Sequence, residues 1–203
     1  EKAGIIKKQV PVVIGNVQGE ALKVISSIAD NHSSKLLKSS HLKPRWVSGE
    51  ITLNNPYIKV KTSFKEAVNK WNIAMAWKVA DVLSKPFPIS TEQFIEAVES
   101  FEGAPGRFEK IHPEYEWYFS GAHNPEALKS SVEASKGLKP QDKTVLIFSV
   151  LKDKFNSEFV RLVKGFGRIY FVEQEGERAA TFRQIRQKVE AELIDENNRK
   201  IIL

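Results

Sequence analysis

The sequence predicts an α/β protein built from two successive pieces. Short apolar runs alternate with stretches of helical periodicity along most of the 203 residues, a pattern typical of sheets covered by helices. The four-residue sequence GAPG at 103–106 contains two glycines and a proline. Such a stretch can be neither helix nor strand interior, so we expect a domain junction there.

Composition and charge narrow the class of protein. With 41% hydrophobic and 28% charged residues, the chain is neither collagen-like nor wholly disordered. The net charge of +6 is spread without a basic stripe, which suits anionic small molecules such as nucleotides and gives no reason to expect nucleic acid. The absence of cysteine excludes disulfides, thiolate zinc sites and a cysteine nucleophile. No run approaches the ~20 apolar residues of a membrane span, so we expect a cytoplasmic protein without a membrane partner.

In the first piece, periodicity predicts a strand-helix unit, a hairpin and two further helices. The expected elements are a strand at 10–14, a helix at 20–32, hairpin strands at 50–53 and 58–61, and a long helix at 64–83. Ser90 and Gln93 have the spacing of a capping box and open a shorter helix.

The second piece predicts a mixed sheet covered on both faces. Strands at 107–111 and 116–119 are too close for a helical crossover and should be antiparallel. The remaining expected elements are a helix opened by Asn124-Pro125, a strand at 145–148, a helix at 157–164, a strand at 169–172, a helix at 182–193 and a last strand at 201–203.

The densest polar cluster of the second piece is SGAHNP, residues 120–125, between a strand and a helix. Ligands bind beyond the carboxyl ends of strands, and helix N-termini attract phosphate. Asn124 is a natural N-cap. His123 is either a ligand contact or part of a solvated loop, and Arg107 either reaches a phosphate or is a surface cation. No P-loop, GxSxG or HExxH motif is present, so by residues alone the chain is an α/β protein with an anion site.

Six stretches in register resemble one family. They are EKAGIIKKQVPVVIG at 1–15, NKWNIAMA at 69–76, PGRFE at 105–109, SGAHNPEAL at 120–128, LIFSVLKDK at 146–154 and ERAA at 177–180. In this order they resemble the folylpolyglutamate synthase/dihydrofolate synthase branch of the Mur ligase superfamily. The resemblance implies that residues 1–103 are the distal part of a central ATPase domain, without its P-loop portion. Residues 104–203 would then be a Rossmann-like Mur ligase C-terminal domain with a mixed sheet, so that the chain is a carboxy-terminal part of a longer enzyme.

The resemblance implies an ATP-dependent amide ligase that uses Mg2+. A substrate carboxylate of dihydropteroate or a folate is phosphorylated by ATP, and the amino group of glutamate attacks the acyl phosphate. The enzyme would act as a monomer, and the 203 residues alone would be inactive.

Two site residues implied by the resemblance lie in the first piece. Lys2 matches the lysine that is carbamylated in the family, and the carbamate would supply oxygens for a magnesium site. Asn72 matches the asparagine of the family's HQxxN helix and would contact ATP, although Val68 and Asn69 replace the His and Gln.

Three further site residues lie in the second piece. Arg107 matches the PGR arginine, expected on the phosphates, and His123 matches the histidine of DGAHNP beside the nucleotide. Ser120 stands where the family has a nucleotide-binding aspartate, and it lacks the charge and the second oxygen of that carboxylate. Ser149 stands where glycine is common.

Three alternatives remain open. The nearest is a muramyl-peptide ligase of the same superfamily. Ser120 and the loss of the His-Gln pair also suit a non-catalytic nucleotide- or folate-binding module. The third is a structural interaction protein.

Overall fold

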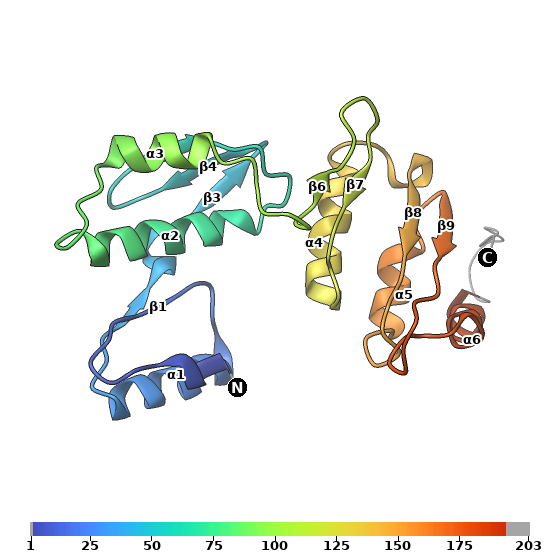
Figure 1. Ribbon diagram of the computed structural model, residues 1–203, viewed down its shortest axis with the longest axis horizontal. Helices are drawn as coiled ribbons and strands as arrows, with labels where there is room; N and C mark the ends of the chain where they lie inside the picture. Colours follow the sequence, from blue (N-terminus) through green and yellow to red (C-terminus); the bar gives the residue numbers. More distant parts are fainter. Residues whose placement is uncertain (1, 194–203) are drawn as a thin grey trace. The chain divides into compact units, whose positions relative to one another are not determined.

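The computed structural model describes residues 2–193, with residue 2 and residues 190–193 described by their backbone alone. The chain divides into two compact units, and the boundary falls between Gly103 and Ala104, inside the GAPG stretch. Figure 1 shows the elements of each unit. No helix in the described part is long and apolar enough to cross a membrane.

The first unit combines a parallel strand pair with an antiparallel sheet of three strands. β1 (Val12–Ile14) and β2 (Leu36–Lys38) pair in parallel, and α1 (Gly19–Asn31) connects them. The antiparallel sheet has the order β3-β4-β5. The remaining elements of this unit are η1 (Lys2–Ile5), η2 (Ser39–Leu42), β3 (Arg45–Val47), β4 (Glu50–Leu53), β5 (Ile58–Lys61), α2 (Asn69–Leu83) and α3 (Thr91–Glu99).

The core of the first unit follows from the alternation of apolar residues in β4 and β5. Every second residue of this hairpin is buried and packs against α2 and α3. The buried residues are Leu42, Ile51, Leu53, Ile58, Val60, Ile73, Ala74, Phe94 and Val98. The predicted capping box opens α3: Ser90 Oγ accepts a hydrogen bond from Gln93 N at 3.2 Å, and Gln93 Oε1 accepts one from Ser90 N at 2.9 Å.

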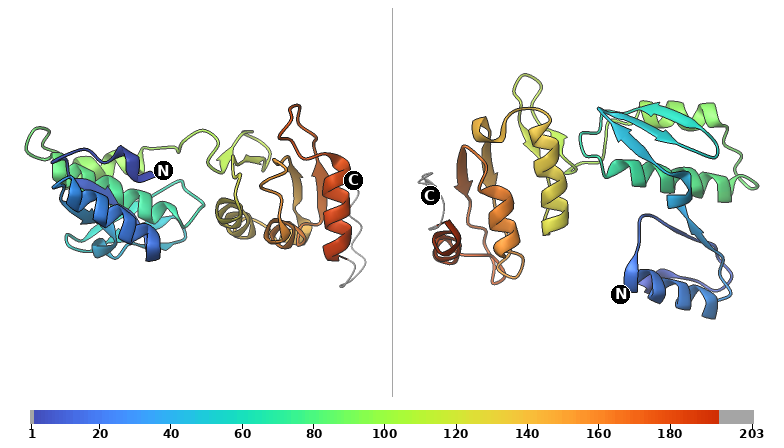
Figure 2. Two further views of the ribbon diagram at one scale, coloured as in Figure 1. Left: turned by 90° about the horizontal axis from the view of Figure 1, so that it is seen from below. Right: turned by 180° about the vertical axis from the view of Figure 1, so that it is seen from behind.

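The second unit combines a short antiparallel hairpin with a parallel strand pair and three helices. Its elements are β6 (Glu109–Lys110), β7 (Tyr118–Phe119), α4 (Pro125–Lys136), η3 (Gln141–Lys143), β8 (Val145–Phe148), α5 (Ser157–Val163), β9 (Arg168–Phe171) and α6 (Phe182–Leu193). The antiparallel pairing of β6 with β7 and the parallel pairing of β8 with β9 agree with the sequence patterns. α4 and α5 lie side by side in Figure 2 and share one apolar core with Ile169 of β9 and Ile185 of α6.

The predicted mixed sheet is wrong for the described residues, whose strands form two separate pairs in this unit. The backbone hydrogen bond from Gly121 N to Gly106 O, at 2.8 Å, lies on the side of β7 that faces β6 and extends the hairpin beyond the two strands. The strand expected at 201–203 lies outside the described residues.

The predicted start of the long helix was also wrong, because α2 begins at Asn69 and not at Phe64. Phe64 is part of a loop and packs edge-on against Phe101, with ring centroids 5.9 Å apart. Ser63 Oγ donates to Phe101 O at 3.3 Å and ties that loop to the segment that follows α3. The apolar stripe therefore continues beyond the helix into a packed loop.

Candidate functional site

The SGAHNP segment connects the end of β7 to the start of α4. Asn124 has an extended backbone and its Oδ1 accepts a hydrogen bond from Ala127 N at 2.9 Å, while Pro125 is the first helical residue. The predicted N-cap is therefore confirmed. The other N–H groups of the first turn face out of this helix end, where they favour an anion.

A backbone hydrogen bond holds the turn that carries Arg107 against the SGAHNP segment. Gly121 N donates to Gly106 O at 2.8 Å, so the turn that carries Arg107 lies against the glycine of the SGAHNP segment. Gly106 has φ +74°, which favours glycine, and its N donates to Glu109 Oε2 at 2.8 Å. The Arg107 side chain is exposed, and no hydrogen bond or ion pair with another described residue engages its guanidinium.

His123 is exposed and held by its own turn. Its Nδ1 lies 3.0 Å from Gly121 O. Because a carbonyl oxygen can only accept, we assign the hydrogen to Nδ1, which leaves Nε2 with a free lone pair in the neutral ring. The histidine thus presents one defined nitrogen beside the start of α4.

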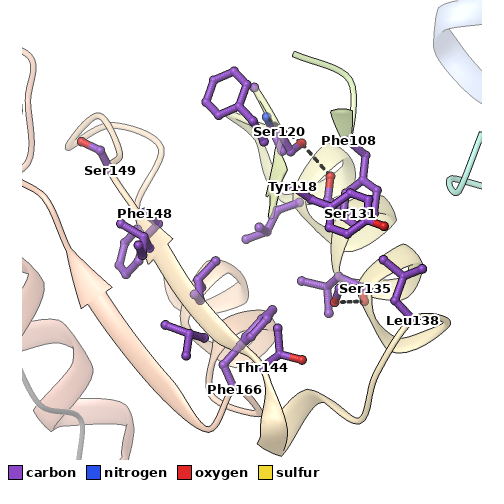
Figure 3. A pocket seen from close by; sticks show the side chains of 18 of the residues that line it. Phe108, Tyr118, Ser120, Ser131, Ser135, Leu138, Thr144, Phe148, Ser149 and Phe166 are labelled. Carbon is purple, nitrogen blue, oxygen red and sulfur yellow. Dashed lines mark hydrogen bonds between the residues drawn. The ribbon is translucent and has the colours of Figure 1, made fainter. Parts of the chain in front are cut away.

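Ser120 connects β7 to the middle of α4. Its Oγ lies 2.8 Å from Ser131 Oγ and accepts a longer hydrogen bond, of 3.3 Å, from Ala122 N. Ser131 is buried and Ser120 half-buried. The two hydroxyls hold the hairpin against the helix (Figure 3).

A cavity of about 480 Å³ extends from Ser120 between the hairpin, α4 and β8. Phe108 and Tyr118 form one wall, and their stacked rings have centroids 5.0 Å apart. Tyr118 donates its hydroxyl to Glu116 Oε2 at 2.8 Å, and burial together with this bond raises the pKa of Tyr118 to about 12. The sequence reasoning missed this cavity. The signal for it is the alternation by which Phe108, Tyr118 and Ser120 share one face of the hairpin.

Lys2 and Asn72 belong to the first unit. Lys2 begins η1, and its side chain lies outside the described part of the chain. Asn72 is exposed on α2, where its Nδ2 donates to Asn69 Oδ1 at 2.9 Å. Within the second unit, the structure brings together the segments that carry Arg107, Ser120 and His123. Among residues 2–193 there is no group of three or more acidic, His or Cys side chains that could hold a metal ion.

The sequence similarities identify the family. The profile of the Mur ligase, glutamate ligase domain matches residues 106–202. A dihydrofolate synthase/folylpolyglutamate synthase of Bacillus subtilis (strain 168) is 31% identical over 166 residues. The chain belongs to the folylpolyglutamate synthase/dihydrofolate synthase family. A folylpolyglutamate synthase of Lacticaseibacillus casei is 27% identical over 187 residues. These alignments cover 76% and 86% of the chain but only 38% and 43% of the two synthases, so the chain spans less than half of their length.

Solved structures of this synthase family share the fold. The Mycobacterium tuberculosis folylpolyglutamate synthase complexed with ADP has a TM-score of 0.77 and 17% sequence identity. The alignment covers 94% of the chain and 45% of the length of that synthase. A complex described as FPGS-AMPPCP-folate aligns with 96% of the chain and 50% of its own length, with a TM-score of 0.72 and 21% identity. At these identities the likeness establishes the fold of the chain as that of part of a synthase.

Proposed function

We propose that the chain is part of an ATP-dependent ligase that joins glutamate to dihydropteroate or a folate. The observation that carries this proposal is the convergence of Arg107 and His123 at the start of α4, produced by the hydrogen bond between Gly121 and Gly106. The family of the chain and the nucleotide in related synthase structures support it. In this proposal residues 1–103 are the distal part of the central ATPase domain and residues 104–203 the Rossmann-like C-terminal domain.

The reaction is a two-step condensation. The terminal phosphoryl group of ATP is transferred to a carboxylate oxygen of the acid, and ADP leaves. The unprotonated amino group of glutamate then attacks the acyl carbon, phosphate leaves with its electron pair, and the nitrogen loses a proton. Both steps move negative charge among phosphoryl oxygens, so cations and N–H donors that are held in place lower the barrier.

Three side chains of the second unit would contact the nucleotide in this proposal, and Arg107 is the cation among them. The exposed Arg107 guanidinium can donate two parallel hydrogen bonds to phosphate oxygens. Neutral His123 accepts a hydrogen bond at Nε2 from a hydroxyl or amino group of the nucleotide. Ser120 offers one hydroxyl where a carboxylate would offer two charged oxygens.

The first unit contributes Asn72 and Lys2 in this proposal. The exposed Asn72 amide can both donate to and accept from the nucleotide. Magnesium would neutralise phosphoryl charge, with a carbamate on Lys2 as one of its oxygen ligands. The described residues contain no group of three or more acidic, His or Cys side chains that could hold the ion by themselves.

A substrate panel tests the proposed function. The longer protein that carries these 203 residues is incubated with ATP, Mg2+ and glutamate, together with dihydropteroate, a reduced folate or a muramyl-peptide precursor, and the products are identified by mass spectrometry. We expect one glutamyl adduct per ADP formed with the pterin-containing acids. A product from the muramyl precursor alone would identify the related ligase instead.

The second candidate is a nucleotide-binding module without ligase activity, and Ser120 is the observation that favours it. Saturable ATP binding by the longer protein without any glutamyl product from the panel would establish that candidate and contradict the proposed ligation.

A further inference from the structure

The strands of the second unit turn one face towards its helices. Leu146 and Phe148 of β8 and Phe171 of β9 pack against the core that contains α4 and α5. Ser120, at the end of β7, contacts Ser131 of α4, so the hairpin turns its face to the same side. In the left view of Figure 2, α4 and α5 lie on one side of these strands. Because side chains alternate along a strand, the intervening residues point away from the helices, on what we call the outer face.

The outer face is apolar and exposed. Large apolar side chains project from it on the four strands or directly beside them, and each is between 41% and 63% exposed: Ile111, Trp117, Phe119, Val145, Ile147, Tyr170 and Val172. Phe119 of the hairpin and Ile147 of β8 both line the cavity, so the two halves of the outer face adjoin across it. The charged residues on the same face, Glu109 and Arg168, are the first residues of β6 and β9 and lie at its rim.

The outer face is large enough for a stable protein interface. Its seven apolar side chains expose roughly 800 Å². The largest apolar patch on a typical monomer has about 300–600 Å², so this face is larger than is usual for a surface that stays in water. A stable interface takes about 800 Å² from each partner. A second copy of the chain that presents the same face supplies that area.

The chemistry of the outer face also suits a second copy. Its interior carries no charged side chain, so two such faces can meet without burying like charges or an unpaired ion. Trp117, Phe119 and Tyr170 belong to the residue types that are enriched at the centre of interfaces. Parallel strands such as β8 and β9 are normally covered on both faces, and two strand layers stack face to face with their inner side chains interdigitated.

We propose that the outer face of the second unit is the interface of a homodimer, in which the strand layers of two copies pack face to face about a two-fold axis. Each copy contributes the same residues, as in any two-fold interface between identical chains. The rim charges have no assigned contact. The proposal adds an interaction surface to the chain and does not depend on ligation.

The experiment measures the mass of the purified 203-residue chain by sedimentation equilibrium over a series of concentrations. Ile147→Lys places a charge on the β8-β9 half of the outer face, and Trp117→Lys places one on the hairpin half. Val47→Lys is the matched control, because Val47 is an exposed strand residue of the first unit. Trp117→Phe keeps the face apolar, and the fluorescence lost with it reports the surroundings of Trp117. Thermal unfolding followed by circular dichroism checks that each variant is folded.

We expect a discrete equilibrium between monomer and dimer with a dissociation constant in the micromolar range or below, as is usual for interfaces of this area. Ile147→Lys and Trp117→Lys should each weaken the dimer at least tenfold, because each would bury an unpaired charge. The Val47→Lys chain should dimerise as the unchanged chain does. The emission of Trp117 should move to shorter wavelength as the dimer forms.

Three results would overturn the proposal. One is a monomer at every concentration, the state that the family resemblance implies. Another is a dimer that the folded Ile147→Lys and Trp117→Lys chains both retain at full strength. The third is the formation of open-ended assemblies in place of a dimer. Sedimentation needs no turnover, so failure of the ligation panel leaves all of these outcomes readable.

Discussion

Gly121 N donates a hydrogen bond to Gly106 O at 2.8 Å, and this one contact joins the turn of the PGR stretch to the SGAHNP segment. Arg107 follows the first of these glycines and His123 lies two residues after the second. Two short motifs that are separate in the sequence therefore present a cation and an imidazole at one end of α4. The geometry of the proposed phosphate site depends on these two glycines.

Gly106→Ala tests that dependence. Gly106 has φ +74°, and an L-residue in the left-handed region costs about 1–2 kcal/mol. We expect the free energy of unfolding of the second unit to fall by about that amount in a urea titration followed by circular dichroism.

Gly121→Ala is the matched control for this prediction, because Gly121 does not have a positive φ and an added Cβ would meet Gly106 O at 3.4 Å, an ordinary contact. Its loss of stability should be smaller. Equal losses for the two variants would show that the backbone conformation of Gly106 is not what matters.

Arg107→Ala tests the phosphate contact. In the longer enzyme, loss of one preorganised cation should lower kcat/KM by about 10²–10³-fold. Arg107→Lys should restore part of the activity, because lysine keeps the charge but lacks the two parallel donors. Arg168→Ala is a suitable control, since Arg168 is an exposed arginine at the amino end of β9, away from the strand ends that carry the site. An Arg107→Ala enzyme with the kinetics of Arg168→Ala would make Arg107 a surface cation.

Ser120→Asp tests the departure from the family pattern. The new carboxylate would lie beside Ser131 Oγ and Ala122 N, which can both donate to it, and near the positive end of α4. If position 120 contacts the nucleotide, a charge-assisted hydrogen bond should tighten ATP binding by about 1–3 kcal/mol. Isothermal titration of ATP against the longer protein measures the change. Weaker binding would mean that the pocket is built around the serine and its bond to Ser131.

We expect the stability of the chain to fall at alkaline pH, where Tyr118 ionises. Burial and the hydrogen bond to Glu116 raise the pKa of Tyr118 from 10.0 to about 12 in the folded chain. The neutral phenol therefore stabilises the fold fully below pH 10, and this contribution is lost as the pH rises from 10 to about 12. The difference between ultraviolet titrations of the unchanged chain and of Tyr118→Phe should show one phenol that ionises near pH 12. A difference curve centred near pH 10 would contradict the raised pKa of Tyr118.

Local signals in the sequence predicted the caps and most of the elements. Ser90 with Gln93 and Asn124 with Pro125 form the predicted caps because each acts on backbone groups within three residues of itself. The strands β4, β5 and β8 have the predicted bounds. The alternating apolar residues of β4 and β5 fill the core of the first unit, and Leu146 and Phe148 of β8 pack against the core of the second unit.

Non-local pairing could not be predicted in the same way. β2 and β3 have three residues each and carry too little periodicity to be recognised. The hairpin and the β8-β9 pair form separate sheets in the described residues, and no pattern within a single strand reveals which strands pair. Phe64 was assigned to a helix because an apolar residue packed in a loop matches the helical stripe equally well.

Only part of the candidate site could be predicted. Motif resemblance selected Arg107, Ser120 and His123, which the structure places within one unit around the start of α4. The cavity was missed because its walls come from a hairpin, a helix and a strand whose side chains meet only in the folded unit. The roles of all five predicted residues, Lys2 and Asn72 included, stay predictions.

The most direct test of the central claim is glutamate-dependent ADP release, measured in parallel for the 203-residue chain and for the longer protein that contains it. If these residues form one wall of the active site of a ligase, the longer protein should release ADP only when ATP, glutamate and a pterin-containing acid are all present. The 203-residue chain should release none, because it has no P-loop to hold the terminal phosphates. Glutamate-dependent ADP release by the 203-residue chain alone, or its absence from the longer protein, would contradict this account.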